Sequence, residues 1–242
     1  MKKMITYKQR AIFYNSELVI DKNLEKFLLC VRDTFDLKNV MLIPCGSGKY
    51  INIYRKLFSK SYFIDCENEM ISQLKSKCNY DNIIPLVGNL NDEININTDA
   101  VFVLNQGMQF LSYREFKKFI YNYSKHNKYF ILDLFDFFKN SSDSLNYYNI
   151  LDKEISSIFY HDGKLIKRNI SYSRYRNKIN FLYTYNNDYQ MKFNLYNYRY
   201  KDIIKILDTI PNLVVKYVYA DYSMNFYNNN NRFILILEVV ND

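Results

Sequence analysis

Short apolar runs and amphipathic stretches alternate along the first half of the chain. Five mostly apolar runs have the length of buried strands, and they span residues 40–45, 62–66, 82–88, 100–105 and 128–135. Apolar residues at helical spacing occupy several of the intervals, at 50–58, 67–77 and 113–124. Continuous apolar strands separated by helices are typical of a parallel sheet covered on both faces. The pattern therefore predicts an α/β core.

The segment before this core, residues 21–37, has the pattern of an amphipathic helix. Its apolar residues recur at helical spacing, and Asp21 is the expected N-cap. The residues that set this spacing are Leu24, Phe27, Leu28 and Val31. We expect the N-terminal part of the chain to be a helical segment that precedes the sheet.

The pattern changes after Asp136. Residues 155–187 contain strand-like runs without helices, and Asp162-Gly163 stands where a tight hairpin turn needs positive φ, which predicts an antiparallel insert. A helical pattern returns at 200–210, and strand-like runs follow at 213–222 and 232–240. The expected order is an N-terminal helical segment, five strand–helix units, a β-rich insert, and a closing helix with two strands.

Composition narrows the class of protein. The 242 residues include 48% hydrophobic and 18% aromatic residues but only 5 Gly and 3 Pro, which argues against a disordered or collagenous chain. No apolar run approaches the roughly 18 residues of a membrane helix, and no apolar stretch follows the basic start. The cysteines form neither a CxxC pair nor a dense disulfide framework: Cys30, Cys45, Cys66 and Cys78. These features predict a cytoplasmic protein without a membrane partner.

The formal net charge of +8 has two interpretations. It fits an anionic partner such as nucleic acid, phosphate or a membrane surface. It also fits a composition in which Asn, Lys, Ile and Tyr are enriched together, with the lysines simply solvated. We favour the second interpretation, because net charge informs solubility more than function.

A glycine turn follows the first core strand in the sequence MLIPCGSGKY, residues 41–50. Such a turn lets a ligand approach the backbone and the first N–H groups of the next helix. A phosphate-binding loop is contradicted by Ile43 at its first glycine position and by Tyr50 in place of Ser or Thr. A dinucleotide fingerprint is contradicted by Ile51 at its third glycine position. A tight turn that binds nothing stays open.

Four further motifs, in order, accompany this turn. The GxGxG pattern reads Pro44, Gly46 and Gly48, and the second strand ends at Asp65 within FIDCENEMI. PLVGNLND and AVFVLNQGMQFL follow, and the last strand-like runs lie in 213–240. Together they resemble class I S-adenosylmethionine-dependent methyltransferases, with Glu67 in place of a motif serine. The likeness spans roughly residues 39–136 and 200–240.

The resemblance implies a Rossmann-like, mostly parallel seven-stranded sheet with an antiparallel last strand and helices on both faces. An antiparallel β insert would serve as a cap. The implied domains are an N-terminal helical lid at 1–38, a methyltransferase core at 39–136 and 200–242, and a substrate cap at 137–199. The layout is most similar to that of bacterial small-molecule N- and O-methyltransferases.

The resemblance also implies roles for individual residues in holding S-adenosylmethionine. Asp65 would accept hydrogen bonds from both ribose hydroxyls, although a solvated or helix-capping aspartate is the alternative. Asn89 and Leu90 would contact adenine, or Asn89 would be a plain turn residue. The remaining contacts would come from Cys45, Gly46, Ser47 and Gly48 at the methionine portion, and from Cys66 and Met70 at the adenosine face. For Met70 the favoured alternative is a core methionine on a helix.

Two departures from the family pattern concern the methionine end. Leu42 replaces the usual first acid, so backbone carbonyls near Pro44 and Asn105 would have to accept the cofactor amine. Pro44 replaces the first glycine, which a trans proline at a strand end tolerates.

Methyl transfer needs collinear positioning more than a catalytic side chain, so no catalytic residue is assigned. If the acceptor arrives protonated, the candidates for a base are Tyr14, Gln106 and His161, although an exposed turn residue is the favoured interpretation of His161. No metal is expected, because no cluster has ligand spacing.

Substrate choice is expected to depend on the insert. Its residues Ile179, Phe181, Tyr183 and Tyr185 alternate onto one face, as a pocket roof or a sheet core would require. Three basic residues, Arg174, Arg176 and Lys178, alternate on one face of the preceding run, where they would meet an anionic substrate or solvent.

The expected function is methyl transfer to an amine or hydroxyl of a small molecule, such as an amino sugar, an amino acid or a peptide-derived natural product, with S-adenosylhomocysteine as product. The partner would be a small-molecule or peptide acceptor, and the protein a monomer or homodimer. An RNA or DNA methyltransferase is an alternative, although residues 104–107 match neither the [DN]PP[YF] pattern nor a cysteine nucleophile. A catalytically inactive binding module of the same fold is the non-enzyme alternative.

Overall fold

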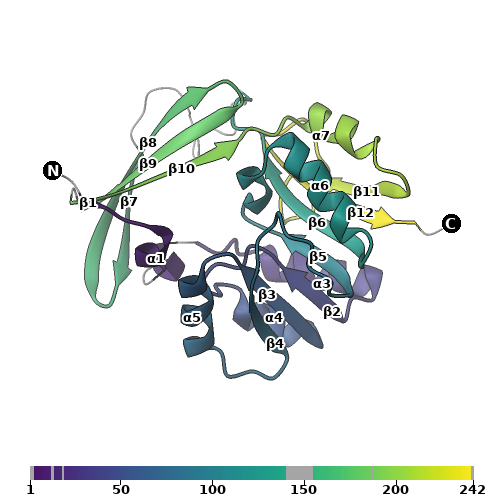
Figure 1. Ribbon diagram of the computed structural model, residues 1–242, viewed down its shortest axis with the longest axis horizontal. Helices are drawn as coiled ribbons and strands as arrows, with labels where there is room; N and C mark the ends of the chain where they lie inside the picture. The colour runs from purple at the N-terminus through teal and green to yellow at the C-terminus, as the bar shows by residue number, and fades with distance from the viewer. Residues whose placement is uncertain (1–2, 12–13, 18, 140–154, 187, 241–242) are drawn as a thin grey trace.

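A seven-stranded sheet forms the centre of the computed structural model, which describes residues 3–11, 14–17, 19–139, 155–186 and 188–240 (Figure 1). The strand order is β11-β12-β6-β5-β2-β3-β4. Strands β6, β5, β2, β3 and β4 pair in parallel, and β12 is antiparallel to both β6 and β11. The strands are β2 (Asn39–Leu42), β3 (Lys60–Asp65), β4 (Ile83–Val87), β5 (Thr98–Val103), β6 (Asn127–Phe135), β11 (Leu213–Tyr219) and β12 (Arg232–Val239).

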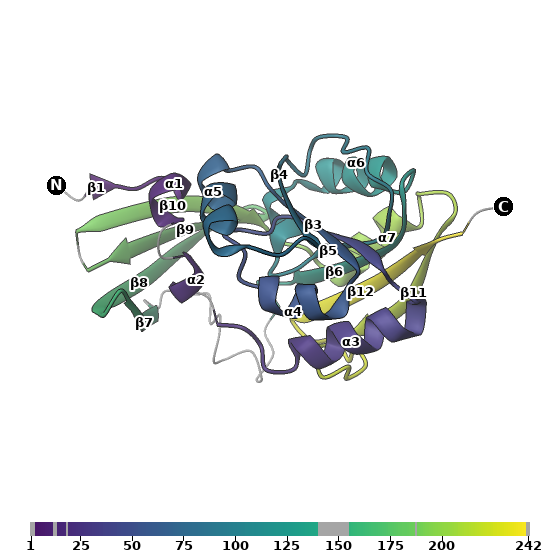
Figure 2. The same cartoon turned by 90° about the horizontal axis from the view of Figure 1, so that it is seen from below.

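Helices cover both faces of this sheet (Figure 2). The apolar cores place α3 (Leu24–Phe35), α4 (Ile51–Leu57) and α5 (Asn68–Lys77) on one face. The other face is covered by α6 (Tyr113–Tyr123) and α7 (Tyr200–Leu207), with a short 3₁₀ helix, η1 (Gly107–Phe110), before α6. Residues 100–103 of β5 are completely buried, as a central strand with two covered faces requires.

A second, five-stranded sheet projects from one end of the core (Figure 1). Its order is β1-β10-β9-β8-β7, formed by β1 (Lys3–Met4), β10 (Tyr189–Tyr196), β9 (Lys178–Tyr185), β8 (Lys164–Tyr175) and β7 (Ile155–His161). Pairing is antiparallel from β7 to β10, whereas β1 joins β10 in parallel. Strand β1 of the N-terminal segment therefore belongs to the same sheet as the strands of the insert. After β1 the chain passes through α1 (Tyr7–Arg10) and α2 (Tyr14–Glu17).

The predicted mixed α/β fold with a seven-stranded sheet is confirmed, as is the hairpin at Asp162-Gly163, where φ is 47° and 72°. The predicted N-cap is wrong. Asn23 holds that position, and Asp21 instead accepts the Asn23 N–H at 2.9 Å, because its side chain turns within the loop before α3. One of the five strand–helix units is also wrong, since residues 88–97 connect β4 to β5 without a helix.

The predicted basic strand face is also wrong. Arg176 has φ 54° in the turn between β8 and β9, so Arg174 and Lys178 lie on different strands. The reversal of the chain at this turn makes Arg174 the pairing partner of Ile179.

The glycine turn after β2 packs against the N-terminal segment. Gly46 and Gly48 have φ of +56° and +83°, which only glycine adopts readily, and the peptide bond between Ile43 and Pro44 is cis rather than the expected trans. A Cβ atom on Gly46 would lie 2.4 Å from Cε1 of Tyr14. The turn thus brings its backbone directly against an aromatic ring.

A pair of glycine substitutions tests this contact. Gly163 also has positive φ, +72°, but a Cβ there meets no atom within 4 Å. Gly163→Ala should therefore lower the free energy of unfolding by about 1–2 kcal/mol, which is the cost of the backbone conformation alone. Gly46→Ala should lower it by roughly 1–3 kcal/mol more, because the Tyr14 ring must move. Urea unfolding of both variants measures the difference, and equal losses would contradict the packing argument.

Candidate functional site

A cavity of about 870 Å³ lies at the carboxyl ends of the core strands, between the glycine turn, the N-terminal segment and the inserted sheet. Ligands of open α/β sheets bind at this edge, and the volume is within the range of pockets for small molecules. Its lining at the strand ends includes Ile43 after β2, Asp65 of β3, Asn105 after β5 and Asp133 of β6.

Asp65 joins the ends of the first two core strands. One carboxylate oxygen accepts the Gly46 N–H at 2.8 Å, and the other accepts the Glu67 N–H at 3.1 Å. Its side chain is buried at the cavity wall. Burial raises the pKa of Asp65 and outweighs the two backbone hydrogen bonds, which lower it. The predicted acid and the predicted glycine turn therefore meet at one place.

Most of the cofactor-binding residues expected from the sequence line this cavity. They are Pro44, Gly46, Asp65, Cys66, Met70, Asn89, Leu90 and Asn105. Cys45, Ser47 and Gly48 are buried but are not among the lining residues. Ser47 instead donates to Oδ1 of Asn15 at 2.8 Å, while Nδ2 of Asn15 donates to the Ser47 carbonyl at 3.1 Å. These two hydrogen bonds attach α2 to the glycine turn.

Asn89 lies in a turn of its own. Its side-chain oxygen accepts the Asn91 N–H at 3.0 Å, and its backbone N–H donates to Asp92 at 3.1 Å. The residue is exposed at the cavity edge, so its side chain already has a structural role there.

Two of the three candidates for a base line the cavity, namely Tyr14 and Gln106, whereas His161 is not among the lining residues. His161 contacts Ser16 Oγ at 3.2 Å and Asp162 at 3.3 Å. Burial raises the pKa of Tyr14 to about 12, against the opposing effect of Arg10. A phenol with this pKa stays protonated at neutral pH, so Tyr14 offers a hydrogen-bond donor and a ring face.

The floor of the cavity contains an ionic network that the motifs did not reveal. Asp133 accepts hydrogen bonds from Arg232 Nε at 2.8 Å, the Tyr222 hydroxyl at 2.9 Å and the Asn105 N–H at 3.0 Å. Arg232 also lies 3.6 Å from Asp21, and Tyr50 bonds the Asn105 side chain. A lone Asp within the apolar run of β6 was the available signal, because a buried charge needs a partner.

A second ionic cluster, formed by Arg10, Glu17, Arg168 and Tyr185, lies where the N-terminal segment meets the insert. Arg10 binds Glu17 through two hydrogen bonds of 2.7 and 2.8 Å, and Arg168 contacts the same carboxylate. The Tyr185 hydroxyl donates to it at 3.3 Å. Burial would raise the pKa of Glu17, but the two guanidiniums outweigh it and lower that pKa. The partners of Glu17 lie 7 to 168 positions from it in the chain, so no local pattern marks the cluster.

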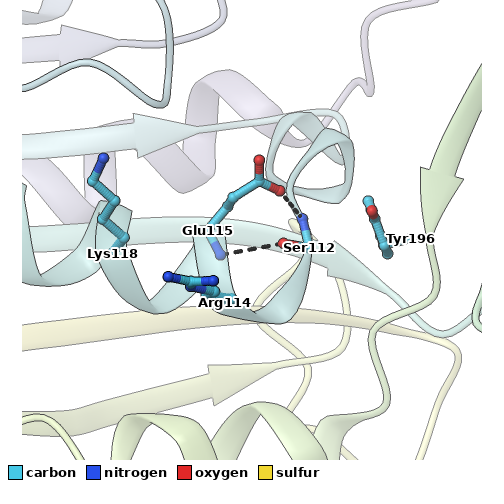
Figure 3. Close-up of a pocket in the computed structure, with 5 residues that line it drawn as sticks. All are labelled: Ser112, Arg114, Glu115, Lys118 and Tyr196. Carbon is cyan, nitrogen blue, oxygen red and sulfur yellow. Dashed lines mark hydrogen bonds between the residues drawn. The ribbon is translucent and has the colours of Figure 1, made fainter.

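A shallower hollow of about 680 Å³ lies at the start of α6, lined by Ser112, Arg114, Glu115, Lys118 and Tyr196 (Figure 3). The carboxylate in this hollow, that of Glu115, already caps the helix. Glu115 accepts the Ser112 N–H at 2.7 Å, and the Ser112 hydroxyl accepts the Glu115 N–H at 3.3 Å, which is a capping box. We therefore place the chemistry in the larger cavity.

Within the described residues, no three His, Cys, Asp or Glu side chains are grouped so that they could hold a metal ion. Over the same part of the chain, every helix is too short or too polar to cross a bilayer.

Comparison with solved structures places this architecture among known folds, although the sequence matches no protein-family model and no curated protein. An S-adenosylmethionine-dependent methyltransferase from Clostridium acetobutylicum superposes with a TM-score of 0.76 at 16% identity, over 97% of this chain and 99% of that one. A sugar N-methyltransferase from Streptoalloteichus gives 0.69 at 12% identity, over 96% and 93%.

An amino pentose methyltransferase from Micromonospora echinaspora, solved with S-adenosylmethionine bound, gives a TM-score of 0.65 at 11% identity, over 99% and 100% of the two chains. These similarities extend over the core and the insert together, and they agree with the resemblance noted in the sequence motifs. The chain therefore has the fold of the S-adenosylmethionine-dependent methyltransferases.

Proposed function

We propose that this protein transfers a methyl group from S-adenosylmethionine to an amine or hydroxyl of a small molecule. The observation that carries the proposal is the buried Asp65 carboxylate, 2.8 Å from the Gly46 N–H in the cavity at the strand ends. An acid and a glycine turn at this edge form a cradle for an adenosyl group. The shared fold supports the same activity.

The residues around Asp65 suit adenosine. The Asp65 carboxylate lines the cavity, and each of its oxygens has a lone pair beyond the one that accepts the Gly46 or Glu67 N–H, so it can also accept hydrogen bonds from the two ribose hydroxyls. Met70 and Leu90 supply apolar surface for the base, and the exposed Asn89 stands beside them. The Cys66 side chain lines the same end of the cavity.

The floor network suits the amino-acid end of the cofactor, where Leu42 leaves no carboxylate. That leucine is completely buried in the apolar core. Arg232 can bind the methionine carboxylate, and Asp133 or Asp21 can accept hydrogen bonds from the amine. These residues lie beside Asn105, whose carbonyl was the acceptor expected from the sequence. In this proposal the missing acid is replaced by residues from β6, β12 and the loop before α3.

S-adenosylmethionine supplies an electrophilic methyl carbon on a cationic sulfur. An acceptor nitrogen or oxygen forms the new bond to that carbon as the carbon–sulfur bond breaks, and the acceptor loses a proton. The chain contributes positioning, exclusion of water and ring faces such as that of Tyr14 next to Gly46. Because Tyr14 remains protonated, it acts here as a positioning residue. The acceptor's proton passes to solvent, since the neutral amide of Gln106 can accept a hydrogen bond but is too weak a base to take a proton.

The acceptor would lie under the inserted sheet, against the aromatic residues Phe181, Tyr183 and Phe193. Two proteins of similar fold are described as methyltransferases of a sugar and of an amino pentose. We therefore expect an amino sugar, an amino acid or a peptide-derived compound.

Binding of S-adenosylhomocysteine by calorimetry tests the cofactor site. Asp65→Asn should weaken binding by about 2 kcal/mol, roughly thirtyfold, because a charged acceptor for two hydroxyls is lost. Asp81→Asn, in the exposed turn before β4, is the matched control and should change nothing. Unchanged affinity in Asp65→Asn, or no binding by the wild-type protein at millimolar concentration, would contradict the proposal.

The pH dependence of this binding follows from the raised pKa of Asp65. Affinity should fall as pH decreases through that pKa, above the range of an ordinary aspartate, since protonation removes the acceptor. The contribution of Asp65 to the free energy of unfolding changes with pH in the opposite direction. The contribution of Asp65 is present below its unfolded pKa and is lost as pH rises through the folded value. Asp65→Asn should abolish both dependences.

The floor network has a separate test that uses 5′-methylthioadenosine, which lacks the amino-acid end. Arg232→Gln should weaken S-adenosylhomocysteine by roughly tenfold or more while leaving methylthioadenosine within about threefold. Arg55→Gln is the control, because Arg55 is exposed and its guanidinium lies 4.3 Å from the half-buried Tyr80 ring, away from the cavity lining. Equal losses for both ligands would show a general structural effect and reject the assignment.

Nucleic-acid methylation and a non-catalytic binding module stay as alternatives. Release of S-adenosylhomocysteine with any small acceptor would exclude the binding module. A salt-dependent gel shift with RNA would favour nucleic acid.

A further inference from the structure

The ionisable residues that line the large cavity are divided by sign. Around the proposed cofactor end are four carboxylates, those of Asp21, Asp65, Glu67 and Asp133, with the guanidinium of Arg232. Under the inserted sheet the proportions are reversed, with Arg10 and Arg168 against Glu17. A cationic sulfonium suits the first end, whereas the second end has an excess positive charge among the described residues.

The excess positive charge is that of Arg168, because Arg10 alone is enough to pair with Glu17. Arg10 already binds both oxygens of Glu17, at 2.7 and 2.8 Å, which is the bidentate geometry that satisfies a buried carboxylate. Removing a second guanidinium from water is costly unless another anion meets it. Arg168 has nevertheless only 16% of its side chain exposed.

Neighbouring side chains hold the Arg168 guanidinium in a position from which it can bind an anion. It lies on β8, where its Nε donates to Ser157 Oγ of β7 at 3.0 Å and its Nη1 contacts Glu17. Its guanidinium carbon is 5.1 Å from the centre of the Tyr183 ring. Nη2 donates no hydrogen bond within the described residues, so its N–H groups are available to a ligand in the cavity.

From this arrangement we infer that the methyl acceptor carries an anionic group, a carboxylate or a phosphoryl, which binds to Arg168 beneath the inserted sheet. That the anionic compound is the methyl acceptor rests on the proposed function, whereas the anion site itself is inferred from the cavity alone. The aromatic side chains Phe181, Tyr183 and Phe193 would hold the apolar part of the same compound. The nucleophile then points away from the anion, toward the strand ends.

Three compounds with one ring and different head groups test the site: benzoate, phenyl phosphate and the neutral benzamide. NMR titration of the wild-type protein, with and without S-adenosylhomocysteine, should give at least roughly tenfold tighter binding for one of the anions than for benzamide. Whichever anion binds more tightly identifies the head group. Arg168→Gln should remove the preference, and Arg168→Lys should keep part of it.

Arg174→Gln is the matched control, because Arg174 lies on the same strand but is exposed and does not line the cavity. It should retain the preference. Unaltered S-adenosylhomocysteine binding in Arg168→Gln would show that the fold and the cofactor end are intact. Equal binding of the three compounds, or a preference that survives Arg168→Gln, would overturn the inference. If the anions bind as expected but S-adenosylhomocysteine does not bind the wild type, the proposed function fails and the anion site stands.

Discussion

The contact between the Asp65 carboxylate and the Gly46 N–H is the constraint on which the site depends. It fixes the end of β3 against the turn after β2, at 2.8 Å, and both residues are buried. The turn then presents Gly46 to the Tyr14 ring, and the Arg10 guanidinium lies 4.9 Å from the centre of that ring. Arg10 binds Glu17, which Arg168 of the insert also contacts. A continuous series of contacts therefore connects the edge of the core sheet to the inserted sheet.

The core strands and the first half of the site could be predicted from the sequence because their causes are local. Apolar runs such as 100–104 are buried on both faces, so their composition alone identifies them. Gly46 and Asp65 are separated by a single strand–helix unit, and adjacent parallel strands bring their ends to one edge. The hairpin at Asp162-Gly163 follows from the φ values that this pair tolerates.

The ionic clusters could not be predicted because their members are far apart in the chain. Arg232 pairs with Asp133 across 99 positions, and Arg168 with Glu17 across 151. A charge within an apolar strand indicates that a partner exists, but many basic residues in this chain could be that partner. The burial of Cys45, Ser47 and Gly48 behind the cavity wall could not be predicted either. A motif gives the order of residues and not which of them face the ligand.

Charge pairs help to hold residues 14–17 and 19–21 beside the cavity, together with Ile20, which packs against the apolar core. This segment has two anchoring carboxylates, Glu17 toward Arg168 of the insert and Asp21 toward Arg232 of the core. Between them Val19 is 80% exposed, so apolar burial at that position does not hold the segment. The exchange of hydrogen bonds between Asn15 and Ser47 adds a third attachment. Because each attachment joins a different part of the molecule, the position of the segment depends on the core and the insert being correctly placed at the same time.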